Sequence, residues 1–389
     1  MKEFNYYQPT EISFGRGRVD EIGEIVTRFG KRCLIVTGPP SPEIDPLRKK
    51  VKECLIRCGL EVAHFDKVIP NPTTDVVSEG AELAKAHNAD IVLGLGGGSS
   101  MDTAKAIAVE ATHEGTAWDY LFFRDTQPTE KTLPVITVTT TSGTGSHVTQ
   151  VAVITNPAEK NKSAIYNSIV YPKVSIVDPE LMLTVPKHIT ASTGFDVFAH
   201  AFESYINPNG SVYTDLMALE AIRLVAEYLP SAVENVSDIE ARKQMAWADT
   251  LAGLCIANSG VTLPHGIGMA IGGMYPHVKH GEALAVVYPA ILRFSYQHAP
   301  KKFATVGRLF DARLNQMDDR KATERTCEVI EEFIKNIGLL TCLEDLKIPE
   351  DELKTLAEAS LVLPDYKSHP RVASLDEVFE LLKQSCRGG

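Results

Sequence analysis

The sequence contains no apolar run of the length needed to cross a bilayer, and its first residues, 1–7, lack the apolar core of a secretory signal. We therefore expect a soluble, cytoplasmic protein. Basic residues are in deficit, because 39 Lys and Arg face 50 Asp and Glu and give a net charge of -11 at pH 7. This balance, with no basic stripe in the sequence, argues against a nucleic-acid-binding surface.

The cysteines do not form the pattern of a disulfide framework. They are odd in number and scattered: Cys33, Cys54, Cys58, Cys255, Cys327, Cys342 and Cys386. Scattered thiols in a long chain are typical of a reduced protein. Cys54 and Cys58 could share a helical face, but two buried thiols are expected there rather than a second metal site.

The length and the hydrophobic pattern predict two domains. Short β-rich runs alternate with helical patterns over about the first 180 residues, which is typical of βαβ units and a mainly parallel sheet. We expect its strands at 33–37, 60–68, 89–95, 133–139 and 173–177, with a small antiparallel excursion at 148–155 and 163–168. From about Pro186 onward apolar residues recur at helical spacing. The sequence therefore predicts an α/β domain at 1–183 and an all-helical domain at 184–389.

Four residues with metal-ligand chemistry fall in the predicted helical domain. Asp196 and His200 are four positions apart, so on a helix both project from one face. His265 and His280 are separated by glycines and Pro276, which allow the chain to bend and the two imidazoles to converge. One carboxylate with three imidazoles suits Fe²⁺ or Zn²⁺ and disfavours calcium and magnesium. Each histidine alone is better explained as a hydrogen-bonded or exposed side chain, but the four together predict a metal site.

A glycine-rich segment, 96–98, follows the predicted strand at 89–95 and precedes a helical pattern. Three glycines at a strand end let the backbone approach a pyrophosphate, whose charge the next helix N-terminus stabilises. Ser99 or Ser100 can cap that helix, with Asp102 in its first turn.

A second loop, at 139–146, is rich in hydroxyl groups and follows the predicted strand at 133–139. Either loop alone could be a turn without a ligand, and neither has the usual Gly-x-Gly-x-x-Gly pattern of a Rossmann fold. Two such loops on neighbouring strand ends predict a dinucleotide site more strongly than either one.

These motifs resemble the iron-dependent, or group III, alcohol dehydrogenase family over nearly the whole chain. The resemblance rests on the four metal-type residues and on segments 15–17, 70–72, 96–105, 140–149, 177–179 and 370–371. It implies a dehydroquinate-synthase-like architecture, with an N-terminal dinucleotide-binding α/β domain, a C-terminal helical domain and a metal in the cleft. It also implies an NAD(P)-dependent enzyme that transfers hydride between the nicotinamide and a small alcohol, aldehyde or ketone, and a homodimer or larger homo-oligomer.

The resemblance assigns roles to individual residues. The metal ligands are Asp196, His200, His265 and His280, and the metal is Fe²⁺ or Zn²⁺. The expected NAD or NADP contacts are Gly97, Gly98, Ser99, Asp102, Thr140, Thr141 and Thr144, with Lys162 near the ribose.

Three departures from the family pattern change these expectations. Gly38 stands where the family often has an acidic residue that repels a 2′-phosphate, so NADP is at least as plausible as NAD. His147 replaces a glutamate. Met269 stands where many relatives carry a second histidine, and His277 is new in the same segment. Either His277 is a catalytic proton relay, or it is a surface residue and the pocket is simply more apolar.

Two other readings stay open. A dehydroquinate-synthase-like lyase also uses NAD and a metal, but it needs several basic phosphate ligands, and only Lys279 lies near the proposed ligands in the sequence. A non-catalytic nucleotide or metal sensor would bind without turnover. The sequence does not define the substrate, because specificity depends on how the fold arranges the pocket.

Overall fold

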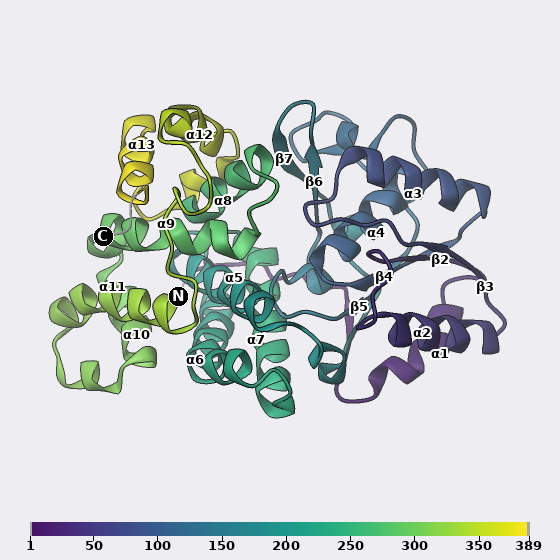
Figure 1. The fold of residues 1–389 in the computed structure, drawn as a ribbon, viewed down its shortest axis with the longest axis horizontal. Helices are drawn as coiled ribbons and strands as arrows, with labels where there is room; N and C mark the ends of the chain where they lie inside the picture. Colours follow the sequence, from purple (N-terminus) through teal and green to yellow (C-terminus); the bar gives the residue numbers. More distant parts are fainter. Residues whose placement is uncertain (1, 387–389) are drawn as a thin grey trace. The chain divides into compact units, whose positions relative to one another are not determined.

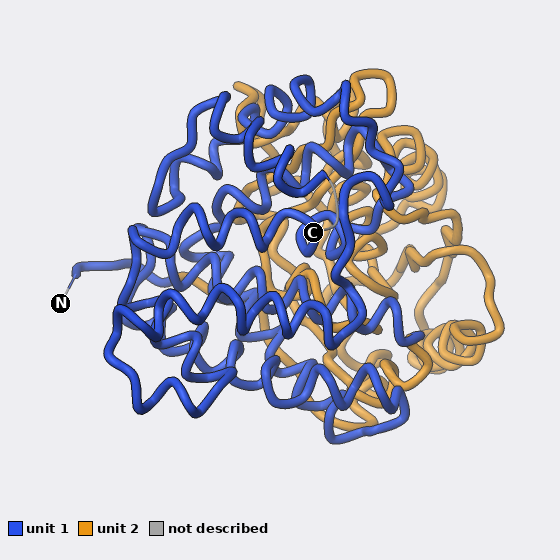
Figure 2. Tube along the Cα trace, turned by 60° about the vertical axis from the view of Figure 1, so that its left-hand side comes forward, with its two compact units in different colours: residues 1–6, 186–389 blue, residues 7–185 orange. Residues whose placement is uncertain are grey.

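The computed structural model describes residues 2–386 and divides the chain into two compact units. Of the described residues, 7–185 form one unit, and 2–6 together with 186–386 form the other (Figure 2). The sequence predicted a division between residues 183 and 184, whereas the units divide between Val185 and Pro186. The N-terminal residues join the helical unit because the ring of Tyr6 packs 4.5 Å from that of Tyr213.

A six-stranded parallel sheet forms the middle of the α/β unit (Figure 1). Its strands are β1 (Glu11–Phe14), β2 (Arg32–Val36), β3 (Glu61–Phe65), β4 (Ile91–Gly96), β5 (Val135–Thr139) and β8 (Val174–Val177). They lie in the order β1-β8-β5-β4-β2-β3. The five predicted parallel strands are confirmed, and the short edge strand β1 was not predicted. The predicted antiparallel pair is also present, as β6 (Val151–Asn156) and β7 (Asn161–Tyr166).

Helices cover both faces of this sheet, because alternate strand residues point to opposite sides. Leu34 and Val36 of β2 belong to one apolar core, and Cys33 and Ile35 belong to another. The first core contains α3 (Thr74–Ala86) and α4 (Gly98–Glu110), and the second contains α1 (Ile22–Thr27) and α2 (Asp45–Arg57). Figure 1 shows the two helix pairs on opposite sides of the sheet.

The second unit is helical, as predicted. Its helices are α5 (Lys187–Ile206), α6 (Val212–Glu234), α7 (Ile239–Ser259), α8 (Leu263–Met274), α9 (His280–Ser295), α10 (Pro300–Phe310), α11 (Asp319–Asn336), α12 (Leu353–Ser360) and α13 (Leu375–Gln384). One core joins α5, α6 and α7 to α9, α10 and α11, and a second joins α8 and α9 to α12 and α13. Helix α9 belongs to both cores because it has apolar residues on two sides.

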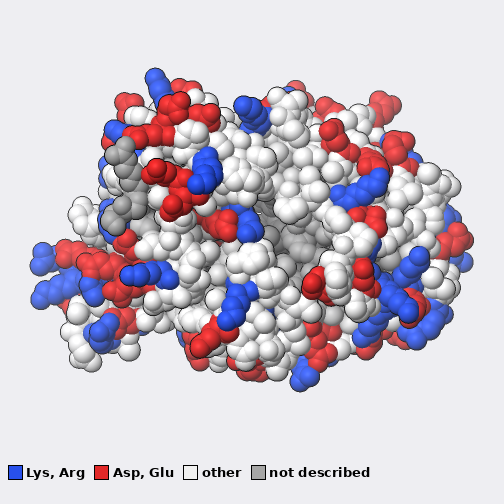
Figure 3. All heavy atoms as spheres, in the orientation of Figure 1, with Lys and Arg blue, Asp and Glu red and all other residues white. Residues whose placement is uncertain are grey.

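Within residues 2–386 no helix is by itself long and apolar enough to cross a bilayer; α7 and α8 reach that length only as a pair bent by 101°. On the face drawn in Figure 3, basic and acidic side chains are interspersed rather than gathered by sign.

Candidate functional site

The two predicted nucleotide loops lie together at the carboxyl ends of neighbouring strands. Gly96 of β4 is the partner of Thr139 of β5, and the backbone N of Thr140 donates to the carbonyl of Gly96 at 3.0 Å. A Cβ on Gly98 would lie 2.5 Å from Cγ2 of Thr144. Glycine is therefore needed at residue 98 for the two loops to approach each other.

The order of the strands reverses beside these loops. From β2 the chain continues to β3, toward one edge of the sheet. From β4 it continues to β5, toward the opposite edge. Ligands of open α/β sheets bind at the carboxyl ends of the two strands where this direction reverses. Gly38 follows β2 and Gly97 follows β4, and a Cβ on Gly38 would meet only the carbonyl of Val68, at 3.5 Å. This glycine-lined place, with the N-terminus of α4 beside it, fits a dinucleotide.

The predicted cap of α4 was wrong. Gly97 takes the capping position, without a side-chain bond, and Ser99 and Ser100 lie inside the first turn. The helix thus begins earlier than expected, and the backbone of Gly97 has the extended conformation that precedes a helix. Asp102 is buried, and its Oδ1 accepts from the Ser146 hydroxyl at 2.6 Å. This carboxylate therefore holds the second loop against α4.

Lys105 is a residue of this region that the sequence analysis missed. It has no exposed surface, and its Nζ lies 2.7 Å from the carbonyl of Ser146, 2.9 Å from that of Thr149 and 2.7 Å from that of Val151. A buried ammonium group needs such acceptors. Lys105 thus fixes the backbone of the second loop, while burial lowers the pKa of its amine to about 8. In the sequence, this role was indicated by the position of Lys105, one helical turn after Asp102.

Lys162 lies on β7 and is also buried. Its Nζ donates to Oδ1 of Asn71 at 2.8 Å, and its positive charge acts on Asp102. Asn71 belongs to the 70–72 segment singled out in the sequence, and its φ of 53° is unusual for a residue with a side chain. The structure therefore joins Lys162, the expected ribose contact, to the 70–72 segment through one hydrogen bond.

The four predicted metal ligands converge within the helical unit. Oδ1 of Asp196 lies 3.7 Å from Nε2 of His200, 3.5 Å from Nε2 of His265 and 3.9 Å from Nε2 of His280. Asp196 and His200 come from consecutive turns of α5, as predicted. The rings of His200 and His265 stack with their centres 4.6 Å apart.

Glycines allow the other two ligands to reach α5. A Cβ on Gly281 would lie 1.9 Å from the carbonyl oxygen of Ser192, so α9 touches the backbone of α5 directly beside His280. A Cβ on Gly268 would lie 2.9 Å from Cδ2 of Leu284, so α8 packs closely against a side chain of α9. These close contacts place three helices around one point.

The donor set fits a divalent transition metal. Atoms bound at about 2.1 Å in a tetrahedral shell lie about 3.4 Å apart, which is close to the spacings found around Asp196. Oδ1 of Asp196 and Nε2 of His265 are buried and have no hydrogen-bond partner among the described residues. Burying such groups without a partner is costly, and a cation between them removes that cost.

Charges within the cluster keep Asp196 ionised and raise the proton affinity of His265, so a cation that binds there displaces a proton. Burial alone would raise the pKa of Asp196, but His200, His280 and His265 outweigh burial and hold the pKa well below its ordinary value. Burial alone would lower the pKa of His265, yet the carboxylates of Glu203 and Asp196 raise it to about 10. The carboxylate of Asp196 therefore stays ionised and available as a ligand.

Glu203 is the second residue that the sequence analysis missed. Its Oε1 lies 2.7 Å from Nδ1 of His265, on the opposite side of the ring from Asp196. The sequence did contain an indication of its place. Glu203 is seven residues after Asp196 and three after His200, and this spacing puts it on the same helical face as both. The sequence alone could not show that His265 would lie against it.

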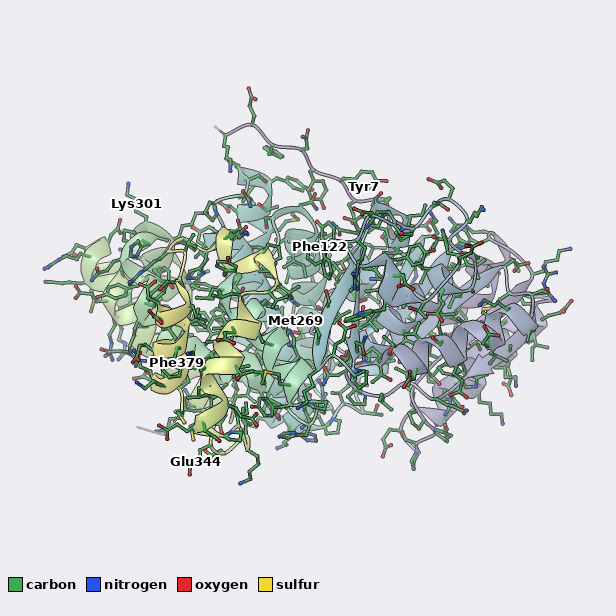
Figure 4. The ribbon with its side chains drawn as sticks, turned by 90° about the horizontal axis from the view of Figure 1, so that it is seen from above. Tyr7, Phe122, Met269, Lys301, Glu344 and Phe379 are labelled. Atoms are coloured by element: carbon green, nitrogen blue, oxygen red, sulfur yellow. The ribbon has the colours of Figure 1, made fainter. Side chains whose placement is uncertain are left out.

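Met269 and His277, the two departures near the ligands, have different surroundings. Met269 lies one turn after His265 on α8, is labelled in Figure 4 and is only 9% exposed. His277 is exposed, and its Nε2 lies 2.9 Å from the carbonyl of Leu346. The structure does not bring His277 into the ligand cluster.

Models of two protein families match nearly the whole chain. "Iron-containing alcohol dehydrogenase" matches residues 9–179, and "Fe-containing alcohol dehydrogenase family, C-terminal" matches residues 190–386. The division between the two models falls close to the division between the two structural units.

Individual relatives match over similar lengths. The chain is 36% identical to an NAD-dependent methanol dehydrogenase of Bacillus methanolicus, covering 98% of this chain and 99% of the relative. It is 34% identical to a 1,3-propanediol dehydrogenase of Klebsiella pneumoniae, with 98% of each chain covered. A solved structure of an archaeal alcohol dehydrogenase from a Red Sea brine pool matches with a TM-score of 0.94 and 36% identity, covering 99% of this chain and 100% of the other.

Proposed function

The chain belongs to the iron-containing alcohol dehydrogenase family and is a metal-dependent alcohol oxidoreductase that uses NAD, and we propose the residues and substrates of this reaction. One observation carries the proposal: Oδ1 of Asp196 faces Nε2 of three histidines at 3.5, 3.7 and 3.9 Å. We propose that Asp196, His200, His265 and His280 hold Fe²⁺ or Zn²⁺.

We propose a separate role in hydride transfer for each group of residues. When bound, the cation supplies Lewis acidity toward the alcohol or carbonyl oxygen, and the nicotinamide supplies the hydride acceptor or donor. Asp196, His200, His265 and His280 would hold that cation within the helical unit. Gly97, Gly98 and Ser99 present backbone N–H groups at the start of α4 to the pyrophosphate. Thr140, Thr141 and Thr144 add hydroxyl groups from the second loop, and Asp102 and Lys162 support the loop and the ribose side.

Gly38 bears on the choice between NAD and NADP. A carboxylate at the end of β2 would repel a 2′-phosphate, and Gly38 offers neither charge nor bulk at that place. We propose that the protein accepts NADP as well as NAD.

The substrate we propose is a short, uncharged alcohol or diol and its aldehyde. The relatives described above act on methanol and 1,3-propanediol by name. Met269 supports this choice, because it places an apolar side chain one turn from the ligand His265 where a histidine would add polarity. The position of His277 lends no support to a proton relay, and the homo-oligomeric state stays a prediction.

The lyase alternative is not better supported. Such an enzyme needs free basic groups near the cation, and Lys279, the basic residue next to His280, pairs with Glu282 at 3.3 Å. A phosphorylated acid near His280 would therefore meet a lysine that is already paired with a carboxylate.

A substrate panel tests the proposal. Metal-stripped protein is restored with Fe²⁺ or Zn²⁺ under anaerobic conditions, and oxidation of NADH and NADPH is followed with short aldehydes, ketones and phosphorylated acids. We expect reduction of short aldehydes with both nucleotides. Binding of nucleotide without reduction of any carbonyl compound would contradict it.

A further inference from the structure

Glu203 is a buried carboxylate beside the proposed metal ligands that is not itself one of them. It lies on α5 with none of its surface exposed, seven residues after Asp196 and three after His200. A buried carboxylate is stable only when charged or polar partners compensate for the lost water. The identity of those partners indicates what Glu203 does.

Two segments of the helical unit contribute these partners, α8 with its cap residue and α9. Oε1 lies 2.7 Å from Nδ1 of His265 and accepts from the Tyr288 hydroxyl at 3.2 Å. Oε2 accepts from the backbone N of Thr262 at 2.8 Å and from its hydroxyl at 3.1 Å. Thr262 is the residue that caps α8, and Tyr288 belongs to α9. Glu203 therefore joins the helices that carry all four ligands.

The contact with Nδ1 determines which nitrogen of His265 can bind a cation. A carboxylate at 2.7 Å keeps a proton on Nδ1, so the lone pair of the neutral ring lies on Nε2. Nε2 is the nitrogen that lies 3.5 Å from Oδ1 of Asp196. The ring is thus held with its ligand atom toward the other ligands.

Glu203 also completes the charge of the cluster. A divalent cation bound by Asp196 and three neutral imidazoles leaves one positive charge in a buried place. The carboxylate of Glu203, which lies 2.7 Å from Nδ1 of His265 and accepts two hydrogen bonds from Thr262, supplies the second negative charge. Burying a neutral cluster costs less desolvation free energy than burying a charged one.

We propose that Glu203 is a positioning residue for the metal, which fixes the tautomer of His265 and retains the cation by its charge. This inference rests on the proposed metal site. Carboxylates that hold a ligating histidine in other metalloproteins contribute about 10-fold to 100-fold in metal affinity, and we expect an effect of that size here.

Glutamine at this position tests both parts of the proposal. Glu203→Gln keeps the size but removes the charge, and it has one acceptor oxygen where Glu203 has two. Nδ1 of His265 and the N–H of Thr262 both need an acceptor, so one of them loses its partner. Glu203→Asp keeps the charge but shortens the reach to Nδ1. Glu240→Gln, an exposed glutamate on α7 that pairs with Lys243, is the matched control.

The readout is the dissociation constant of Zn²⁺, measured on metal-stripped full-length protein by competition with a chelating indicator. The visible absorption of bound Co²⁺ reports the ligand geometry. We expect Glu203→Gln to raise the Zn²⁺ dissociation constant about 10-fold to 100-fold and to shift the Co²⁺ spectrum. Glu203→Asp is expected to lie between this variant and the parent, and Glu240→Gln to match the parent in both measurements.

The outcomes separate this inference from the proposed function. If the parent protein binds neither Zn²⁺ nor Co²⁺ at the cluster, the metal site itself is wrong. If the parent binds Zn²⁺ and Glu203→Gln binds it within twofold of the parent, with an unchanged Co²⁺ spectrum, only the role of Glu203 is overturned. Should Glu203→Gln fail to fold, Glu203→Asp decides, since an unchanged dissociation constant there would equally overturn the positioning role.

Discussion

The Cα of Gly281 packs directly on the backbone of Ser192, so that a Cβ on residue 281 would lie 1.9 Å from the Ser192 carbonyl oxygen. This contact lies next to His280 on α9 and one turn before Asp196 on α5. The distance between these two ligands therefore depends on the absence of one methyl group.

Gly281→Ala is expected to weaken metal binding by separating α9 from α5. The clashing atom belongs to the backbone, which cannot move aside as a side chain can, and overpacking of this kind costs about 1–3 kcal/mol. We expect the Zn²⁺ dissociation constant to rise at least about tenfold. Gly98→Ala, which crowds Thr144 in the other unit, is the comparison: it is expected to weaken NADH binding and leave Zn²⁺ binding unchanged. Equal effects of both variants on Zn²⁺ would argue against this account.

Gly38→Asp is expected to reduce the use of NADPH selectively. A carboxylate at the end of β2 would repel the 2′-phosphate and offer an acceptor to a ribose hydroxyl. We expect kcat/KM for NADPH to fall about tenfold or more, corresponding to about 1.4 kcal/mol, while kcat/KM for NADH is retained. Steady-state rates with one aldehyde and both nucleotides measure this ratio, and a parallel loss with both nucleotides would mean that residue 38 does not face the ribose.

Lys105→Met should destabilise the α/β unit. The change removes the stronger of the two positive charges that act on Asp102 and takes the Lys105 donor away from the carbonyls of Ser146, Thr149 and Val151. Removal of one partner from a buried charged network costs about 3–5 kcal/mol. Denaturant unfolding measures this loss. Lys85→Met, at an exposed lysine paired with Glu82, is expected to change stability by no more than about 0.5 kcal/mol. A similar small effect at Lys105 would show that its contacts contribute little.

His147 should make the protein sensitive to acid. Burial, assisted by the charge of Lys105, lowers the pKa of this imidazole from 6.5 to about 3. The unfolded chain therefore takes up a proton at a higher pH than the folded chain, so the stability contribution is complete above pH 6.5 and is lost as the pH falls toward 3. Each pH unit in that window removes up to about 1.4 kcal/mol.

His147→Gln tests this effect, because glutamine does not titrate. The difference in unfolding free energy between parent and variant should change with pH below 6.5 and stay constant between pH 7 and 8. A constant difference throughout would mean that His147 becomes protonated in the folded protein without penalty.

The sequence predicted the elements that depend on local patterns. Strand β4 and the glycines after it are recognisable from an apolar run and from backbone requirements, and Asp196 and His200 from helical spacing. The four-residue edge strand β1 was missed because its apolar run is too short to stand out. The cap of α4 was misassigned because serine is the commoner capping residue and Gly97 took that position.

Contacts between distant segments could not be predicted from such patterns. Glu203 and Lys105 would both be expected on the surface, since charged residues are rarely buried without partners. Their partners, Thr262 and Ser146, lie 59 and 41 positions away in the sequence. Only the folded chain shows that these charges are enclosed and satisfied.

The most direct test of the central claim is to measure metal content and aldehyde reduction together in the parent and in His265→Ala. Metal-stripped parent is titrated with Zn²⁺ or Fe²⁺, and bound metal and NADH oxidation are followed in the same samples. We predict that activity rises in proportion to bound metal, ends at one equivalent per chain, and is lost together with tight metal binding in His265→Ala. Full activity in the metal-stripped protein, or tight binding and turnover retained in His265→Ala, would contradict the account.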